Sequence, residues 1–202
     1  MSKIELYLIR HGKTYCNKEK LYYGKTDVSL CDEGIIDLID KKKNYIYPLC
    51  EKYFTSGLKR ANETFEILYP NEEYYLVPEL CEYNFGEFEL KSYEDLKENP
   101  KYQEWIMDEV GEVKCPNGES KKEFKERILK GFFNLICELS NENIKSALAV
   151  LHGGTIGMLL EELYDNKKSF IEWQPQGGDG YKLIISLEND VEITSVKEIF
   201  KM

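Results

Sequence analysis

The chain has 202 residues, of which 42% are hydrophobic and 32% are charged, and a formal net charge of −10. Such a chain can bury a sizeable core, and its acidic balance excludes a broad nucleic-acid-binding surface. Charges at Lys3 and Glu5 argue against a signal peptide, and no apolar run is long enough to span a bilayer. Six scattered cysteines without a Cys-x-x-Cys pair favour a reducing compartment, so we expect a cytoplasmic protein.

The first predicted element is a short buried strand that begins near Ile4. It ends in Arg10-His11-Gly12, so the arginine and the histidine lie at its carboxyl end, where ligands bind in open α/β sheets. A second apolar run, residues 147–151, ends in His152, and glycines then open a predicted helix. The chain has only two histidines. Either one alone fits a structural role, but their matching positions indicate a shared site.

These two motifs resemble the signature of the histidine phosphatase superfamily. The first is Arg10-His11-Gly12-x-Thr14 and the second is His152-Gly153-Gly154, and the resemblance runs from about Leu6 to Tyr181. The family includes cofactor-dependent phosphoglycerate mutases and many small phosphatases. The resemblance implies an α/β fold, a three-layer sandwich with a mostly parallel central sheet flanked by helices. It also implies one domain over residues 1–202.

The loop after His11 contains further residues that match the family pattern. Asn17 is an ordinary turn residue by its type, whereas the resemblance makes it a donor to a phosphoryl oxygen. Tyr23 and Gly24 fall where the loop of the family approaches the substrate. Lys13 departs from the pattern, because the family usually has Glu or Gln at this position.

A helix is predicted from Gly34 to Tyr47, and Pro48 stops it. Its apolar residues at 35, 36, 38 and 39 should pack one face on the sheet. Cys31 stands where the family usually has a serine or threonine cap. The start of this helix is therefore expected to be frayed, or to be capped by Ser29 or Asp32.

Residues 52–56 form the next predicted strand, and 74–77 a short third strand. Between them, the segment 56–64 contains the whole family pattern Ser-x-Leu-x-Arg-Ala-x-x-Thr. This pattern places Arg60 in the first turn of a helix. An arginine there ordinarily faces solvent, but the resemblance makes Arg60 a ligand of the phosphoryl group.

The acidic segment that follows resembles the phosphatase branch pattern Leu-x-Glu-x-x-Phe-Gly. Residues 80–86 match it, which aligns Glu82 with the proton donor of the family. Glu79, Glu87 and Glu89 lie close by, so a neighbouring carboxyl group or a merely solvated acidic face stays open as an alternative. Residues 82–89 also resemble the α-ribazole phosphatase branch of small phosphatases.

Residues from about 83 to 120 are predicted to form a helical insertion over the site, where specificity resides. Aromatic residues at 15, 22, 23, 83, 93, 102, 105 and 173 offer rings for stacking on a flat ligand, or simply fill the core. Ser120 and Glu123 form a capping-box signature before a helix with a core-facing apolar stripe. A strand at 146–151, a helix at 154–163, a glycine-rich loop at 173–180 and strands at 181–187 and 191–199 complete the prediction.

These residue types suit phosphoryl transfer without a metal ion or another cofactor. The ring of His11 is a competent nucleophile near neutral pH, and guanidinium groups bind phosphoryl oxygens while keeping their charge. Glu82 would protonate the leaving alcohol and then activate water. The predicted catalytic set is His11, Glu82, Arg10, Arg60 and His152, and the predicted substrate-binding set is Asn17, Tyr23, Gly24 and Gly153.

The function predicted first is a phosphomonoesterase that acts on a small phosphorylated metabolite through a phosphohistidine. A phosphoglycerate mutase is the main alternative, yet Tyr83 follows the acid where mutases have arginine, and residues 83–126 contain no arginine. A catalytically inactive phosphoryl-binding protein is a third alternative, although neither His11 nor the acid has been lost. The natural substrate and the oligomeric state stay open.

Overall fold

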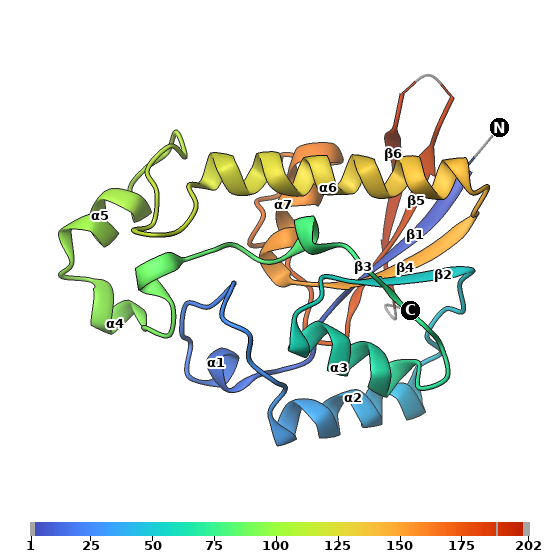
Figure 1. Ribbon diagram of the computed structural model, residues 1–202, viewed down its shortest axis with the longest axis horizontal. Helices are drawn as coiled ribbons and strands as arrows, with labels where there is room; N and C mark the ends of the chain where they lie inside the picture. The colour runs from blue at the N-terminus through green and yellow to red at the C-terminus, as the bar shows by residue number, and fades with distance from the viewer. Residues whose placement is uncertain (1–2, 189, 200–202) are drawn as a thin grey trace.

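The computed structural model describes residues 3–188 and 190–199, and a six-stranded sheet forms the centre of this part of the chain (Figure 1). The strand order is β3–β2–β4–β1–β5–β6. The first four strands in this order pair in parallel, whereas β5 and β6 are antiparallel. The predicted α/β fold is confirmed. The strands are β1 Lys3–Arg10, β2 Lys52–Thr55, β3 Tyr75–Leu76, β4 Ser146–Leu151, β5 Gly180–Ser186 and β6 Glu192–Glu198.

The pairing of β1 with β4 explains how the two histidines meet. The strands run parallel in a register that sets Arg10 beside Leu151, so His11 and His152 leave the sheet at the same edge. Both strands are central and have apolar residues on both faces, as a doubly covered sheet requires. The candidate site therefore lies at the carboxyl ends of two adjacent strands.

Helices cover both faces of the sheet and complete the three layers (Figure 1). Leu6 and Leu8 of β1 pack with the apolar side chains of α6 and α7, while Ile9 faces the opposite way and packs with those of α2 and α3. This alternation follows from the two-residue period of a strand. The four helices are α2 Asp32–Asn44, α3 Lys59–Leu68, α6 Lys121–Asn141 and α7 Gly153–Leu163.

Helix α6 begins and packs as the sequence predicts. The hydroxyl of Ser120 accepts from the backbone N–H of Glu123, and the Glu123 carboxylate accepts from the backbone N–H of Ser120. Burial of each large apolar side chain on the stripe contributes about 1.5–3 kcal/mol. The stripe thus fixes the helix against the sheet. Its predicted members, all buried, are Phe124, Ile128, Phe132, Leu135 and Leu139.

Helix α2 differs from the prediction at its start and on its apolar face. It begins at Asp32, after an N-cap at Cys31 whose side chain makes no capping bond, so neither Ser29 nor Asp32 caps it. Acidic side chains in the first turn favour the positive end of the helix dipole instead. Of the residues predicted to pack on the sheet, Leu38 is buried and Ile35 is partly buried, whereas Ile36 and Ile39 are 58% and 41% exposed, so the prediction is wrong for these two.

Short helices lie beyond the sheet, on the side where the two histidines emerge (Figure 1). They belong to the loop after β1 and to the segment between β3 and α6. Among the described residues, no helix combines the length and the apolar character needed to cross a membrane. The short helices are α1 Tyr15–Lys18, α4 Tyr93–Leu96 and α5 Pro100–Ile106, with single 3₁₀ turns at Pro78–Leu80 and Gly86–Phe88.

Candidate active site

His11 is held in one tautomer by the backbone next to it. Its Nδ1 lies 2.7 Å from the carbonyl oxygen of Gly12, which only accepts, so the ring proton sits on Nδ1 and Nε2 keeps its lone pair. Burial, with the charges of Arg60 and Arg10, holds the pKa of His11 well below its usual value. Thr64 fixes the neighbouring peptide, because its hydroxyl accepts from the N–H of Gly12 at 2.9 Å. The geometry thus provides a neutral, oriented imidazole near pH 7.

Arg60 is completely buried in the first turn of α3. Its Nη1 and Nη2 donate to the carbonyl oxygens of Thr26 and Gly24 at 3.0 and 2.7 Å, and its guanidinium lies 4.8 Å from the ring centroid of Tyr23. Burial lowers the pKa of Arg60 below its ordinary value of 12.5, but a guanidinium group keeps its charge in proteins. The predicted solvent-facing alternative is therefore wrong.

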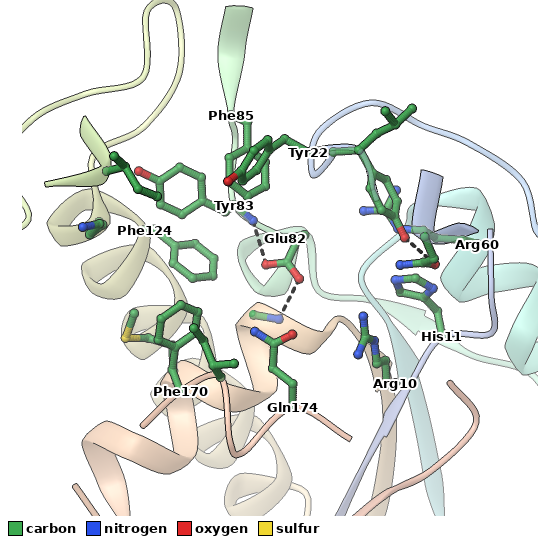
Figure 2. Close-up of a pocket in the computed structure, with 18 of the residues that line it drawn as sticks. Arg10, His11, Tyr22, Arg60, Glu82, Tyr83, Phe85, Phe124, Phe170 and Gln174 are labelled. Carbon is green, nitrogen blue, oxygen red and sulfur yellow. Dashed lines mark hydrogen bonds between the residues drawn. The ribbon is translucent and has the colours of Figure 1, made fainter. Parts of the chain in front are cut away.

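Arg10 reaches the same site from the end of β1. Its Nη1 donates to the carbonyl oxygen of Pro175 at 2.9 Å, which ties the guanidinium to the glycine-rich loop. Gly153 lies so close that a Cβ atom there would come within 2.9 Å of Cζ of Arg10. Figure 2 shows Arg10, His11 and Arg60 together on one side of the cavity.

His152 is fully buried behind His11, with 5.1 Å between the two ring centroids. Its Nε2 lies 2.7 Å from Oγ of Ser56, which also faces the N–H of Leu58 at 3.4 Å. A serine hydroxyl can donate to or accept from Nε2, so this contact fixes the orientation of the His152 ring and directs Nδ1 away from Ser56. Burial, with Arg60 and His11 nearby, lowers the pKa of His152 well below its usual value.

Two buried nitrogen atoms around His11 have no hydrogen-bond partner within the protein. They are Nε of Arg60 and Nδ1 of His152, and they are the only such buried side-chain nitrogen or oxygen atoms among residues 3–188 and 190–199. A buried polar group without a partner costs about 1–3 kcal/mol. An anionic group with several acceptor oxygens, bound between His11 and the arginines, would relieve both costs at once.

Glu82 lies at the amino end of α7, where its carboxylate is held by backbone donors. Oε2 accepts from the N–H of Gly154 at 2.8 Å, and Oε1 accepts from the N–H of Tyr83 at 3.0 Å (Figure 2). Each oxygen keeps a further lone pair for a proton or a ligand. Of the described residues that line the cavity, Glu82 is the only one with a carboxyl group.

The neighbouring acids lie elsewhere, which separates them from the candidate role. Glu79 is exposed, and Glu87 is exposed and accepts from Nδ2 of Asn117 at 2.7 Å. Glu89 accepts from the backbone N–H groups of Lys25 and Thr26 at 2.8 and 2.6 Å, so it fastens the loop after β1. Structural roles thus account for Glu87 and Glu89.

Arg127 of α6, which the sequence analysis missed, fixes the backbone that carries Glu82. Its guanidinium donates to the carbonyl oxygens of Glu79, Cys81 and Glu82 at 2.7, 3.0 and 3.1 Å. It also forms a two-pronged ion pair with Glu119, with N–O distances of 2.7 and 2.9 Å. No local pattern identifies this arginine, because its partners lie 8 to 48 residues away.

The predicted substrate-binding residues fall into two groups. Asn17 and Tyr23 line the cavity; Oδ1 of Asn17 accepts from the N–H of Thr14 at 3.0 Å and from the hydroxyl of Tyr23 at 2.8 Å. Asn17 is therefore a turn residue and a cavity residue at once, and its donor atom Nδ2 points away from this capping box. Gly24 and Gly153 do not line the cavity but pack against its arginines, and a Cβ at Gly24 would lie 1.6 Å from the carbonyl oxygen of Tyr83.

The cavity has a volume of about 490 Å³ and continues well past the two arginines. Figure 2 shows Phe124 and Phe170 on the side of the cavity opposite His11, and Glu82 and Gln174 between the two sides. Of the eight aromatic residues considered for stacking, positions 22, 23, 83 and 105 line the cavity, and 15, 93, 102 and 173 do not. The described residues contain no group of three or more His, Cys, Asp or Glu side chains arranged to hold a metal ion.

The sequence of the chain was compared with those of known protein families and proteins. The model of the histidine phosphatase superfamily (branch 1) matches residues 6–188. The adenosylcobalamin/α-ribazole phosphatase of Salmonella typhimurium is 27% identical over 164 residues, which cover 79% of each chain. A broad-specificity phosphatase of Saccharomyces cerevisiae is 30% identical over 173 residues, which cover 82% of this chain and 73% of the yeast protein.

The fold comparison agrees with the sequence comparison. The crystal structure of the α-ribazole phosphatase of Shigella flexneri superposes with a TM-score of 0.79 at 24% identity, covering 96% of each chain. Phosphoglycerate mutases are also among the matching proteins and structures. The relatives support a phosphatase enzyme that acts on small phosphorylated substrates. This chain belongs to the histidine phosphatase superfamily.

Proposed function

We propose that this chain is a metal-independent phosphomonoesterase that hydrolyses a small phosphorylated metabolite through a phosphohistidine at His11. One observation carries the proposal: a neutral buried imidazole with a free Nε2 lies among two arginines and two unpartnered buried nitrogen atoms. Phosphoryl transfer needs a nucleophile and fixed donors around the equatorial oxygens, and this arrangement supplies both.

The phosphoryl group is proposed to bind between His11 and the two guanidinium groups. Nε of Arg60 and Nδ1 of His152 then gain acceptors, while Nδ2 of Asn17 supplies a neutral donor from the loop. The two arginines provide the positive charge that a metal ion supplies in other phosphatases. Gly24 and Gly153 contribute by allowing the close packing that aims Arg60 and Arg10.

The reaction is proposed to take two steps. Nε2 of His11 attacks phosphorus in line, the bond from phosphorus to the alcohol oxygen breaks, and Glu82 gives its proton to that oxygen. Glu82 then takes a proton from water, whose oxygen attacks phosphorus while the bond to Nε2 breaks. Inorganic phosphate leaves, and His11 and Glu82 return to their starting states.

The proposal includes the organisation of the chain as one domain, residues 1–202, with an insertion over the site at about 83–120. It is supported by the position of Tyr83, Phe85, Trp105 and Ile106, which belong to this segment and line the cavity. This segment is therefore proposed to select the alcohol part of the substrate.

A phosphoglycerate mutase remains the second candidate because mutases are among the relatives. A mutase must hold the carboxylate of its substrate while the phosphoryl group waits on histidine. Beyond Arg10 and Arg60, the described cavity lining contains one further cation, Lys121, whose Nζ donates to the carbonyl oxygen of Asp108 at 2.7 Å. This lining favours hydrolysis. An inactive phosphoryl-binding protein is disfavoured because His11 and Glu82 both line the cavity.

The test is trapping of the phosphoenzyme. Brief incubation with a radioactive phosphoester should give an acid-labile, base-stable label, and His11→Ala should abolish it. His152→Ala is the matched control, because it removes the other buried imidazole and should slow labelling without abolishing it. A label that persists in His11→Ala would refute the proposed nucleophile.

The role of Glu82 is tested with two leaving groups. Glu82→Gln should slow the hydrolysis of ethyl phosphate by about 10²–10⁴-fold, since general acid catalysis contributes this much. Hydrolysis of p-nitrophenyl phosphate should change far less, because nitrophenolate leaves without a proton. Glu87→Gln, in the same acidic segment but outside the cavity, should change neither rate. Equal losses on both substrates would assign the effect to structure.

A further inference from the structure

The part of the cavity away from His11 has walls made of apolar side chains. They come from the loop after β1, from the segment between β3 and α6, from α6 and α7, and from the loop after α7. Figure 2 shows Phe85, Phe124 and Phe170 facing this space. This apolar wall consists of Tyr22, Tyr83, Phe85, Trp105, Phe124, Met158, Phe170 and Ile171.

The polar atoms of the aromatic residues in the apolar wall are already paired within the protein. The hydroxyl of Tyr22 lies 2.6 Å from the hydroxyl of Tyr102, which is itself fully buried. The hydroxyl of Tyr83 donates to the carbonyl oxygen of Glu119 at 2.8 Å and accepts from Nε1 of Trp105 at 2.9 Å. The wall therefore presents mainly carbon to a ligand, and ligand hydroxyl groups placed against it gain few hydrogen bonds there.

The rings of the apolar wall hold one another in place. The ring centroids of Tyr83 and Phe85 lie 4.7 Å apart, those of Tyr22 and Phe85 5.3 Å, and those of Tyr22 and Trp105 5.9 Å. Offset and edge-to-face pairs at these separations stabilise each other. The wall is thus formed before a ligand arrives, and little side-chain entropy is lost on binding.

Phe170 is brought to the apolar wall by a close backbone approach. Its carbonyl oxygen would lie 2.1 Å from a Cβ atom at Gly157, so the loop after α7 reaches the cavity only because this position on α7 is glycine. Ile171, the next residue, is 67% exposed and also lines the cavity, at its mouth. The loop after α7 therefore supplies two members of the apolar wall, Phe170 and Ile171.

Charge at this end of the cavity is sparse. Lys121 is the cation that lines it, and its ammonium group lies 5.8 Å from the ring centroid of Trp105 and donates to a backbone carbonyl. Glu82 faces the phosphoryl end. A carboxylate or a second phosphate of a substrate would meet a single lysine, which already donates to a backbone carbonyl oxygen. A polyol would lose the hydrogen bonds that it forms with water, at a cost of about 1–3 kcal/mol for each unpaired group.

Resting on the proposed phosphomonoesterase function, we propose that the alcohol part of the substrate is an uncharged, planar, carbon-rich group. The apolar wall takes this group while the phosphoryl group lies at His11. Arylmethyl phosphates have this chemistry, whereas sugar phosphates and phosphoglycerates do not. Selectivity then comes from the area of carbon removed from water, not from hydrogen bonds to the alcohol.

The test compares two monoesters whose alkoxide leaving groups differ little in basicity, 2-naphthylmethyl phosphate and ethyl phosphate. We expect kcat/KM to be at least about 100-fold higher for the naphthylmethyl ester, because even one methylene in an apolar pocket changes kcat/KM by about 10–200-fold. Ribose 5-phosphate, which is larger than ethyl phosphate but polar, should not exceed ethyl phosphate.

Two variants in the cavity and one control variant test whether the apolar wall causes the preference for the naphthylmethyl ester. Phe170→Ala should lower the ratio of the two kcat/KM values about tenfold, and Ile171→Asp, at an exposed position that tolerates substitution, should also lower it. Phe133→Ala removes the same ring from α6, where it is 40% exposed and outside the cavity, and should leave the ratio unchanged.

The outcomes separate the two proposals. A ratio near one in the unaltered protein, or a rate for ribose 5-phosphate that matches the naphthylmethyl ester, overturns the inference and leaves the phosphatase proposal standing. A ratio that Phe170→Ala and Ile171→Asp leave unchanged also overturns it. If the protein hydrolyses none of the three esters, the proposed function itself is refuted.

Discussion

The clamp that Arg127 forms on the backbone before Glu82 allows a quantitative prediction about stability and catalysis. The guanidinium makes three hydrogen bonds to carbonyl oxygens and two to Glu119, and one turn further along α6, Gly131 allows the segment at Glu79 to pack against the helix. Arg127→Met keeps most of the side-chain volume and removes all five bonds. The carbonyl oxygens and the carboxylate of Glu119 then lose their donor.

The loss of stability follows from these five bonds. Each contributes about 1 kcal/mol net, which gives an upper value of about 5 kcal/mol. The side chains of Arg127 and Glu119 are 26% and 18% exposed, so water replaces part of the loss and we expect about 3 kcal/mol. For a chain of this size that corresponds to a melting temperature lower by about 6–12 °C.

The catalytic effect should depend on the leaving group. Without the clamp, the backbone of Glu82 is less well fixed, and a displacement of about 1 Å costs about 10²-fold in rate. Hydrolysis of ethyl phosphate should therefore fall by about 10–100-fold, while p-nitrophenyl phosphate, whose leaving group needs no acid, should lose less than about threefold.

Calorimetry or thermal melting and the two-substrate assay measure these effects at a temperature where the variant is folded. Arg127→Lys should lie between Met and the unaltered protein, because an ammonium restores charge but not the forked geometry. Lys130→Met, at an exposed position on the same helix, is the matched control and should change neither quantity. An unchanged melting temperature, or equal rate losses on the two substrates, would refute this account of the clamp.

Three further predictions follow from the candidate site. The folded state lowers the pKa of His11 and His152, so the unfolded chain binds their protons first, and stability should fall as the pH drops below the ordinary value of 6.5. Urea unfolding between about pH 7.5 and pH 5.5 should show a loss of up to about 1.4 kcal/mol per histidine and pH unit, which His152→Gln should reduce. Activity should survive exhaustive chelation, because Arg10 and Arg60 supply the positive charge, and a loss restored by one divalent ion would contradict this. With 3-phosphoglycerate and catalytic 2,3-bisphosphoglycerate, release of phosphate should exceed formation of 2-phosphoglycerate, and the reverse would favour the mutase.

Much of the fold follows from local patterns that the tertiary structure does not override. Residues 6–9 of β1 and 147–151 of β4 are continuous apolar runs, because both faces of a central strand are covered by helices. The start of α6 follows from the capping box at Ser120, where both bonds form within one turn. Helix α2 was predicted less well, since Ile36 and Ile39 fit the periodicity of an apolar face but lie exposed in the structure.

The end of the cavity at His11 was predictable because its residues belong to short sequence motifs. Arg10 and His11 are adjacent in the chain, Arg60 has its own motif, and the parallel register of β1 and β4 brings His152 to the same edge. The orientations of the two imidazole rings were not predictable. They depend on the carbonyl group of Gly12 and on a serine 96 residues away from His152, which only the folded chain brings into contact.

The apolar wall was predictable only in part, since positions 22, 83 and 105 were considered for stacking together with rings that lie outside the cavity. Its residues come from five separate parts of the chain. The periodicity of aromatic residues in the sequence is the same whether they line a cavity or fill the core. Phe124 and Phe132 illustrate this, because both belong to the buried stripe of α6, yet only Phe124 lines the cavity. Phe132 lies about two helical turns further along α6 and is buried in the apolar core that also contains Leu6 and Leu8 of β1. Periodicity therefore identifies the stripe, and only packing decides which of its members meet a substrate.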